Sequence, residues 1–402
     1  MIFRTIPDGW EIKKMPQVVK WGSGGTPKAT EKQYYDGGSI PWLVIGDLND
    51  SIVSSSASKI TELGLQNSSA KMIPVGTLLV AMYGSIGKLG ITGIECCTNQ
   101  AIAYAKELYG VTTKYMFFYM AMMKSELISK GKGGTQKNIS QTVLNSLEVI
   151  VPPLPEQERI VARIEELFSQ LDAGVETLKK IKAQLAVYRQ AVLKEAFESV
   201  IPESDTCNVE DVCKDIKVGI VIKPAQYYTS ADVGVRAFRS ANVREFAVND
   251  SDWVYLTKAG HEANLRSEIH TGDVLVVRSG YPGTACVVPP TYNGCNAIDI
   301  LIAVPYAEKI LPEYLCAYTN SPLGKRIIQE KKRGVAQAHF NVSGYSKTPI
   351  IVPCLETQKR VVAEIDSRLS VCDSIEQTVD VALQQAEAMR QSILKNAFEG
   401  RL

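Results

Sequence analysis

Two stretches of the chain place apolar residues at alternating steps of four and three. In the first stretch these positions are 160, 164, 167, 171, 178, 181, 185, 188 and 192, and only Gly174 departs from the pattern. In the second they are 361, 365, 372, 375, 379, 382, 386, 389 and 393, and Arg368 interrupts the pattern beside Leu369, which can cover the gap. This is the a/d spacing of a coiled coil, so each stretch predicts one long helix of about 43 residues, roughly 65 Å at about 1.5 Å per residue. Prolines at 152, 153, 155 and 353 mark where the two helices begin.

The two stretches are copies of one another. Residues 151–198 align on 352–399 at a constant offset of 201 without a gap, and 19 of the 48 positions are identical. The identities include Gln157 with Gln358 and the closing Arg-Gln and Ala-Phe-Glu groups. A period this long is not that of a solenoid, so the chain is a duplicated half-protein.

The order of segments along the chain predicts how the helices pair. The first helix leaves one globular segment, and the second begins at the other and returns, so packing of the two apolar stripes on each other requires an antiparallel pair. The alternative is that each stripe packs only on its own globular segment. The regular heptads favour the paired arrangement, in which the C-terminus ends near the N-terminus and the halves are circularly equivalent.

The globular segments have the pattern of one α+β domain in two divergent copies. Strands are predicted at 41–45, 76–82, 274–278 and 300–304, and helices at 113–129 and 312–332. Matching landmarks follow in the same order: 73–80 with 269–276, 84–87 with 280–283, and 134–139 with 334–340. The resulting fold class is α+β, with two similar domains joined by two long antiparallel helices in a pseudo-two-fold, circular arrangement. We assign one domain to residues 1–150, the central helix to 151–199, the second domain to 200–351 and the C-terminal helix to 352–402.

Composition and charge narrow the function. The net charge is +1, but residues 1–150 carry 15 Lys and Arg against 11 Asp and Glu, which permits DNA binding if the basic side chains gather on one face. No apolar run reaches the roughly 18 residues of a membrane helix and no secretory signal is recognisable, so we expect a cytoplasmic protein. The nine Cys have no C-x-x-C spacing and the three His are scattered, which favours buried thiols over disulfides or a metal site.

The chain resembles the specificity subunits of type I restriction–modification systems. The resemblance is carried by Pro-Leu-Pro-Glu-Gln-Glu-Arg-Ile at 153–160, its counterpart at 355–360, Arg-Gln-Ala-Val-Leu-Lys at 189–194 and Pro-Asp-Gly-Trp-Glu at 7–11. It implies two target-recognition domains that each read half of a bipartite DNA sequence, and a helix pair that sets the spacer and docks two modification (methyltransferase) subunits. The resemblance also implies that restriction subunits join that complex. It implies no cofactor in this chain, and S-adenosylmethionine, ATP and Mg are expected on the partner subunits.

Candidate DNA contacts come from glycine-rich or basic segments that recur in both halves. Glycine lets the backbone approach phosphate, and Gln, Asn and Arg side chains can pair with base edges. In the first domain the candidates are Lys20, Thr26, Lys28, Ser85, Lys88, Lys132, Gln136, Lys137 and Asn138. In the second they are Arg236, Arg239, Asn242, Arg244, Arg278, Ser279, Tyr281, Lys332, Arg333, Gln337, His339 and Asn341, of which residues 236–244 are expected along one strand edge. The alternative interpretation of each candidate segment is a solvent-exposed run of charged residues or a flexible turn with no role in binding.

Enzymatic motifs are missing from the sequence. There is no Asp/Asn-Pro-Pro-Tyr/Phe tetrapeptide for amino-methylation, and Gly84-Ser-Ile-Gly-Lys88 lacks the first Gly and the Ser/Thr of a nucleotide-binding loop. The acids at 8 and 11 are too close together for a nuclease metal site. We therefore expect a non-catalytic DNA-recognition subunit. The competing hypothesis is a coiled-coil scaffold whose globular heads bind peptides or glycans.

Overall fold

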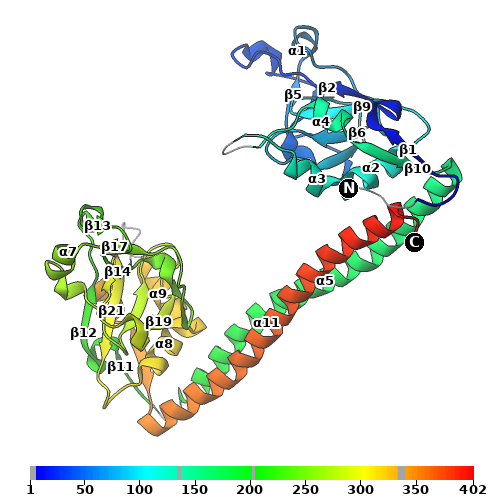
Figure 1. Ribbon diagram of the computed structural model, residues 1–402. Coiled ribbons are helices and arrows are strands. Elements are labelled where there is room, and N and C mark those ends of the chain that lie inside the picture. Colours follow the sequence, from blue (N-terminus) through cyan, green and yellow to red (C-terminus); the bar gives the residue numbers. More distant parts are fainter. Residues whose placement is uncertain (1–5, 134–136, 202–203, 334–339) are drawn as a thin grey trace. The chain divides into compact units, whose positions relative to one another are not determined.

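The computed structural model describes residues 6–133, 137–201, 204–333 and 340–402 (Figure 1). The chain divides into two compact units, each containing one globular domain and part of both long helices. The first unit comprises residues 1–178 and 381–402, and the second comprises residues 179–380. Within the described part of the chain, no helix is both long enough and apolar enough to cross a lipid bilayer.

The first domain is built on a five-stranded sheet of order β2-β9-β6-β7-β4 and a smaller sheet of order β5-β3-β8. Its strands are β1 (Glu11–Lys14), β2 (Val19–Ser23), β3 (Ile40–Leu43), β4 (Ser51–Val53), β5 (Lys59–Ile60), β6 (Leu78–Ala81), β7 (Leu89–Thr92), β8 (Cys97–Thr98), β9 (Ile102–Leu108) and β10 (Glu148–Val151). Its helices are α1 (Glu62–Gln66), α2 (Thr113–Met122), α3 (Lys124–Ser129) and α4 (Gln141–Asn145). Strand β1 pairs antiparallel with β10, which leads into the first long helix.

The second domain repeats this topology. Its strands are β11 (Asp205–Asn208), β12 (Cys213–Val218), β13 (Tyr228–Thr229), β14 (Val235–Phe238), β15 (Val243–Arg244), β16 (Ala247–Val248), β17 (Val254–Leu256), β18 (Val274–Val277), β19 (Ala285–Val287), β20 (Asn296–Ala297), β21 (Ile300–Pro305) and β22 (Pro349–Val352). Its helices are α6 (Val209–Val212), α7 (Lys258–Glu262), α8 (Pro312–Asn320), α9 (Pro322–Arg333) and α10 (Val342–Ser346). The sheet order β12-β21-β18-β19 matches β2-β9-β6-β7, and the parallel pair β14 and β20 matches β3 and β8. The prediction of two copies of one α+β domain is confirmed.

The helix predicted over 312–332 is two helices. Ser321 has φ −68° and ψ 158° and separates α8 from α9, because the proline at 322 disfavours a helical conformation in the residue before it. The equivalent break in the first domain, between α2 and α3, lies at Met123 without a proline.

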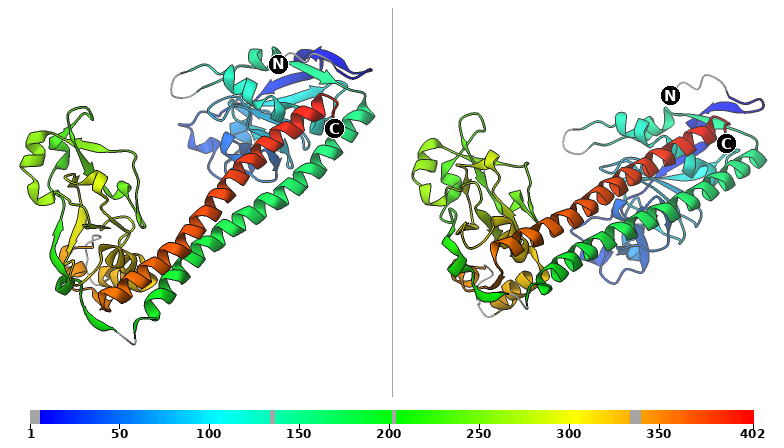
Figure 2. Two further views of the ribbon diagram at one scale, coloured as in Figure 1. Left: turned by 60° about the horizontal axis from the view of Figure 1, so that its bottom comes forward. Right: turned by 90° about the horizontal axis from the view of Figure 1, so that it is seen from below.

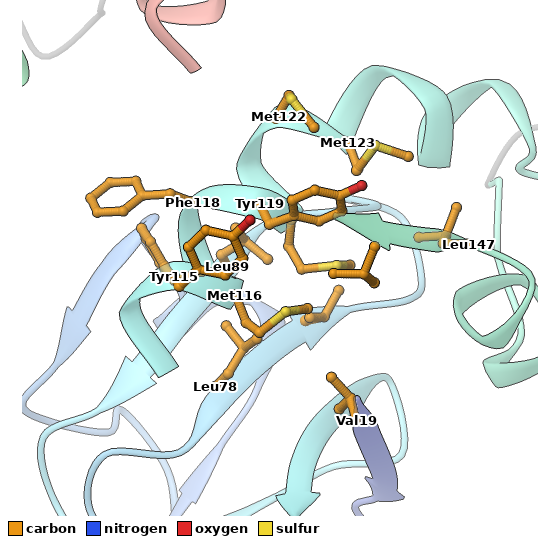
Figure 3. Packing of buried hydrophobic residues seen from close by; sticks show 14 of the residues in the cluster. Val19, Leu78, Leu89, Tyr115, Met116, Phe118, Tyr119, Met122, Met123 and Leu147 are labelled. Atoms are coloured by element: carbon orange, nitrogen blue, oxygen red, sulfur yellow. The ribbon is translucent and has the colours of Figure 1, made fainter. Parts of the chain in front are cut away.

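Apolar side chains of α2 cover one face of the large sheet of the first domain. Tyr115, Met116 and Tyr119 are fully buried and lie over sheet residues such as Leu78 (Figure 3). Fully burying one such side chain stabilises a fold by about 1.5–3 kcal/mol. Helix α8 has the same role in the second domain, where Tyr314 and Tyr318 belong to the core.

The long helices are α5 (Leu154–Glu198) and α11 (Leu355–Phe398). Within each unit they lie side by side in both views of Figure 2 and run in opposite directions. In the first unit Arg159 donates to the backbone carbonyl of Leu402 at 3.0 Å, and Arg390 pairs with Asp172. The predicted antiparallel pairing is therefore confirmed inside the first unit.

The second unit shows the same direction of pairing. Lys182 pairs with Asp380 at 2.7 Å, and Arg189 with Asp373 at 2.6 Å. Arg368, which interrupts the apolar stripe, pairs with Glu195 at 2.9 Å, and Leu369 beside it is buried in its place. Three predicted seam positions are instead exposed: Tyr188 (45%) and Ile375 (40%) in this unit, and Met389 (54%) in the first unit.

Each domain holds the beginning of one long helix and the end of the other. Phe398, at the end of α11, packs edge-on against Tyr115 and Tyr119 of the first domain. Phe197, at the end of α5, packs in the same way against Tyr314 and Tyr318 of the second domain. The C-terminal residue Leu402 packs against the core of the first domain together with Ile6 and Trp10. The circular arrangement expected from the repeat is present.

All nine cysteines are free thiols. Seven of them are buried, Cys207 is half-buried and Cys354 is exposed. Burial raises the pKa of the thiols of Cys96, Cys97, Cys213, Cys286, Cys295 and Cys316, that of Cys96 to about 11, so these residues act as small apolar side chains in the core.

Candidate DNA interface

Two matching turns bring several of the predicted contacts to equivalent places. Residues 82–88 connect β6 to β7, and residues 278–284 connect β18 to β19, so both segments close antiparallel hairpins as the sequence predicted. The amide of Gly87 donates to the carbonyl of Ala81 at 3.0 Å, and the amide of Gly283 donates to the carbonyl of Val277 at 3.0 Å. The two turns therefore have one backbone geometry and different side chains.

Glycines make this geometry possible. Gly84 and Gly280 have φ of +63° and +80° at the two tips, and Gly87 and Gly283 have φ of +75° and +90°. Residues with a Cβ rarely adopt these angles. No atom lies within 4 Å of where a Cβ on Gly84 or Gly280 would be, so the tips are open to solvent on that side.

A cleft of about 780 Å³ lies beside the turn of the second domain. Three predicted contacts line it: Arg244, Ser279 and Tyr281. Tyr281 is 86% exposed, the highest value of any large apolar or aromatic side chain in the described chain. An exposed aromatic ring at a rigid turn tip is suited to stacking on or packing against a base.

The glycine-rich segment of the first domain is joined to its turn. The amide of Gly84 donates to the carbonyl of Lys137 at 3.1 Å, and the amide of Ile139 donates to the carbonyl of Met82 at 2.8 Å. Lys132 and Asn138 form a backbone bridge, and their side chains are exposed, as is that of Lys137. Ser85 is exposed in the same turn and Lys88 is half-buried. These five predicted residues thus belong to one surface, and Gln136 lies outside the described residues.

The matching segment of the second domain is described in part. Phe340 donates its amide to the carbonyl of Arg278 at 3.2 Å, which is the counterpart of the bond between Ile139 and Met82. Lys332 and Arg333 lie in α9, while Gln337 and His339 fall outside the described residues. The side chain of Asn341 is exposed and caps α10 by accepting a hydrogen bond from the amide of Gly344 at 2.7 Å.

Residues 236–244 do not form the single strand edge that their spacing suggested. Asn242 is fully buried, and its amide donates to the carbonyls of Asn249 at 3.2 Å and Ser251 at 2.8 Å while its Oδ1 accepts from the amide of Arg239. This side chain holds a turn together and has no exposed atom to offer to DNA, so we remove it from the predicted contacts. Its counterpart Asp47 accepts from the amide of Val44 at 2.7 Å in the first domain.

The arginines of this region are divided between structural and surface positions. Arg236 lies in β14 over the ring of Trp253 at 5.6 Å, and Arg239 pairs with Asp252 at 2.8 Å. Arg278 pairs with Asp299 at 3.2 Å, and its Nε is buried with no hydrogen-bond partner. Arg244 is exposed at the cleft. Of the four, Arg244 is the best placed to contact DNA.

In the segment 20–28 of the first domain the side chains of Lys20, Thr26 and Lys28 are exposed, whereas Gly24, Gly25 and Pro27 are buried. Lys20 pairs with Glu107 at 3.1 Å, and the hydrogen bond and charge of that carboxylate raise the pKa of Lys20. Thr26 donates to the side chain of Gln100, and Lys28 pairs with Glu31 at 3.3 Å. Two lysines with carboxylate partners bring less free positive charge to this surface than the sequence suggested.

The two surfaces share one ion pair that was not predicted from the sequence. Lys124 pairs with Asp50 at 3.0 Å, and Lys325, at the offset of 201, pairs with Glu245. The first pair connects the start of α3 to the segment after the buried residue Leu48. The second connects the first turn of α9 to the segment after the buried residue Val243. The signal was present, because the two lysines obey the repeat offset. Their acidic partners follow no sequence spacing, since they come from loops of different length.

Residues 7–186 match the family model of the type I restriction modification DNA specificity domain. The specificity subunit of the type I restriction enzyme EcoKI from Escherichia coli K12 is 22% identical over 99% of this chain and 90% of its own length.

Solved structures share the fold. A structure from a study of complex assembly and conformational transition of the type I restriction–modification system has a TM-score of 0.76 at 17% identity, covering 99% of this chain and 100% of that one. The HsdS subunit from Thermoanaerobacter tengcongensis has a TM-score of 0.53 at 17% identity, covering 99% and 98% of the two chains.

Proposed function

Because the chain belongs to the family of type I restriction–modification specificity subunits, we propose that each globular domain reads one half of a bipartite DNA target. The chain is a sequence-specific DNA-recognition subunit and has no catalytic role of its own. The scaffold hypothesis with peptide- or glycan-binding heads is not favoured by the relatives. The exposed turns and the cleft of the second domain are the surfaces that we assign to DNA.

The observation that carries the proposal is the repeated anchoring of each domain on both long helices. Gln157 and Phe398 hold the first domain, and Gln358 and Phe197 hold the second in the same way. Two domains of one topology, held equivalently, present equivalent surfaces. Their side chains at those surfaces differ, as they must if the two half-sites differ in sequence.

The partners follow from the family. The chain acts with DNA and with methyltransferase and restriction subunits. We propose in addition that two methyltransferase subunits dock on the helix pair, and that S-adenosylmethionine, ATP and Mg belong to partner subunits. A cytoplasmic location is part of the same proposal.

The test is selection from a pool of random duplexes by the full chain assembled with its methyltransferase subunits. We expect the bound DNA to contain two fixed blocks separated by a gap of constant length and arbitrary sequence. Raising the salt concentration should weaken binding to all duplexes, because contacts to phosphate release counterions. Bound DNA with no common sequence, or with one uninterrupted block, contradicts the proposal.

A further inference from the structure

The two turns have the same backbone and carry different side chains. Position by position, Tyr83 corresponds to Ser279, Ser85 to Tyr281, and Lys88 to Thr284. The bond between the amide of Lys88 and the carbonyl of Ser85, at 3.1 Å, has its counterpart in the bond between Thr284 and Tyr281, at 3.3 Å. The amides of Ala81 and Val277 donate to the carbonyls of Lys88 and Thr284, both at 2.8 Å. Equivalent hydrogen bonds therefore fix each pair of residues in an equivalent place.

A second segment adjoins each turn. Asn49 and Arg244 are exposed, and each directly follows a buried apolar residue, Leu48 or Val243. Asp50 and Phe246, which follow in these segments, both have a positive φ. The amide of Asp50 donates to the carbonyl of Leu89 and the amide of Phe246 to that of Ala285, both at 3.0 Å, and each acceptor is the first residue of the strand after the turn. The second domain has one residue more here, Glu245, which is the partner of Lys325.

The supporting groups are held alike in the two domains while the exposed groups change. The glycines with positive φ, the ion pair to α3 or α9, and the buried Leu48 or Val243 recur in both. The side chains at the matched turn positions differ in chemistry: Tyr83, Ser85 and Tyr281 are exposed, and Lys88, Ser279 and Thr284 are half-buried. Asn pairs with two edge atoms of adenine, Arg with two of guanine, and an aromatic ring packs on a base face or a thymine methyl group. One backbone geometry therefore presents different hydrogen-bonding and stacking groups at equivalent places in the two domains.

We propose that these four matched positions determine which bases each half-site contains. The first-domain set is Asn49, Tyr83, Ser85 and Lys88, and the second-domain set is Arg244, Ser279, Tyr281 and Thr284. The inference rests on the proposed function and goes further, because it assigns half-site specificity to a small interchangeable set of side chains on a common support. Of these side chains, Arg244, Ser279, Tyr281 and Thr284 all line the cleft of the second domain.

The test is to transplant one set onto the other support in the full chain. The variant Asn49→Arg, Tyr83→Ser, Ser85→Tyr, Lys88→Thr is assembled with the methyltransferase subunits, and its target is determined by selection from random duplexes beside the wild type. We expect the bases of the first half-site to change or their selection to be lost, while the second half-site and the gap stay as in the wild type. An unchanged first half-site, or equal weakening of both half-sites, overturns the inference.

Two further variants distinguish an effect on DNA recognition from an effect on folding or on total charge. Tyr281→Ser alone changes an 86% exposed side chain that packs on little of the protein, so it is expected to fold and to alter only the second half-site. Lys71→Thr is the matched control, because it removes one positive charge from an exposed site of the first domain outside the turn and should leave both half-sites unchanged. Failure of the wild type to select a bipartite target contradicts the proposed function itself. A bipartite wild-type target that none of the turn variants alters contradicts the further inference alone.

Discussion

Two buried glutamines show how a single residue joins each domain to a long helix. Oε1 of Gln157 accepts from the amide of Thr112 at 3.0 Å, and its Nε2 donates to the carbonyls of Gly110 and Pro152 at 2.8 and 2.9 Å. Gln358 repeats the arrangement with the amide of Leu311 and the carbonyls of Lys309 and Pro353. Both side chains are 0% exposed. Each side chain satisfies three backbone groups, of which the carbonyl of Pro152 or Pro353 is buried.

Replacing either glutamine by alanine should destabilise the protein by roughly 2–4 kcal/mol, since three hydrogen bonds are lost and buried backbone groups are left unpaired. Denaturant unfolding of Gln157→Ala and Gln358→Ala measures this, and the two losses should be similar because the bonds are the same. Glu158→Ala is the control, because it changes an exposed neighbour and should stay within about 0.5 kcal/mol of the wild type. A loss below about 1 kcal/mol for both glutamine variants contradicts this account.

The sequence identified these glutamines as repeat identities and left their role open. Their partners, such as Gly110 and Lys309, lie 47 and 49 residues away along the chain and belong to no motif. The opposite error occurred at Asn242, whose amide side chain was interpreted as a DNA contact and instead holds a turn. Sequence reveals which side chains can form hydrogen bonds, whereas burial decides which groups they bond to.

At the scale of elements, the contact between a domain helix and a long helix differs in charge between the halves. In the first unit Lys114 of α2 pairs with Glu165 of α5 at 2.8 Å. In the second unit the equivalent residues are Glu313 of α8 and Asp366 of α11. Partial burial, and then the charge of Glu313, raise the pKa of Asp366. Two carboxylates thus face each other where the first unit has an ion pair.

The variant Asp366→Asn should be more stable than the wild type at pH 7 by a few tenths of a kcal/mol, a small effect because the site is exposed to solvent. A raised pKa in the folded state means that ionised Asp366 opposes folding above that pKa and ceases to do so below the ordinary Asp pKa of about 4. The advantage of the variant should therefore shrink as the pH falls from 7 to about 4. Thermal unfolding at several pH values measures this.

The first unit supplies the reference for that experiment. Glu165→Gln removes the ion pair to Lys114 and should lower stability at pH 7 by at most about 1 kcal/mol. Opposite signs for the two variants support the assigned charges, and a loss of stability in Asp366→Asn at pH 7 contradicts them.

At the scale of the whole molecule, both long helices continue without a break through the boundaries of the compact units, at 178/179 in α5 and 380/381 in α11. Charged pairs that obey the repeat offset bind the helices inside each unit: Arg390 with Asp172, and Arg189 with Asp373. The closing Arg-Gln group seen in the sequence repeat therefore contributes its arginine to the contact between helices.

Insertion of one heptad at each of the two boundaries tests whether the helix pair sets the gap between half-sites. Seven residues preserve the a/d register and add about 10 Å, which corresponds to roughly three base pairs at about 3.4 Å each. We expect duplex selection to return the wild-type half-sites with a gap longer by about three base pairs. Insertion into α5 alone is the control, because it lengthens only one helix, so that the ion pairs between the helices cannot all form, and it should weaken assembly. An unchanged gap in the double insertion excludes a ruler role for the helices.

The sequence by itself determined the duplication, the two long helices, their antiparallel direction and the α+β class. Heptad spacing and the repeat offset can both be read directly from the order of residues along the chain, without knowledge of which distant segments meet. It also marked the two glycine turns, since positive φ restricts the residue type. Only the tertiary structure decided that Asn242 is internal, that Arg278 and Arg239 are paired with carboxylates, and that Asn49 and Arg244 adjoin the turns. These facts depend on which distant segments meet and on which side chains their packing withdraws from water, and no spacing along the chain encodes that.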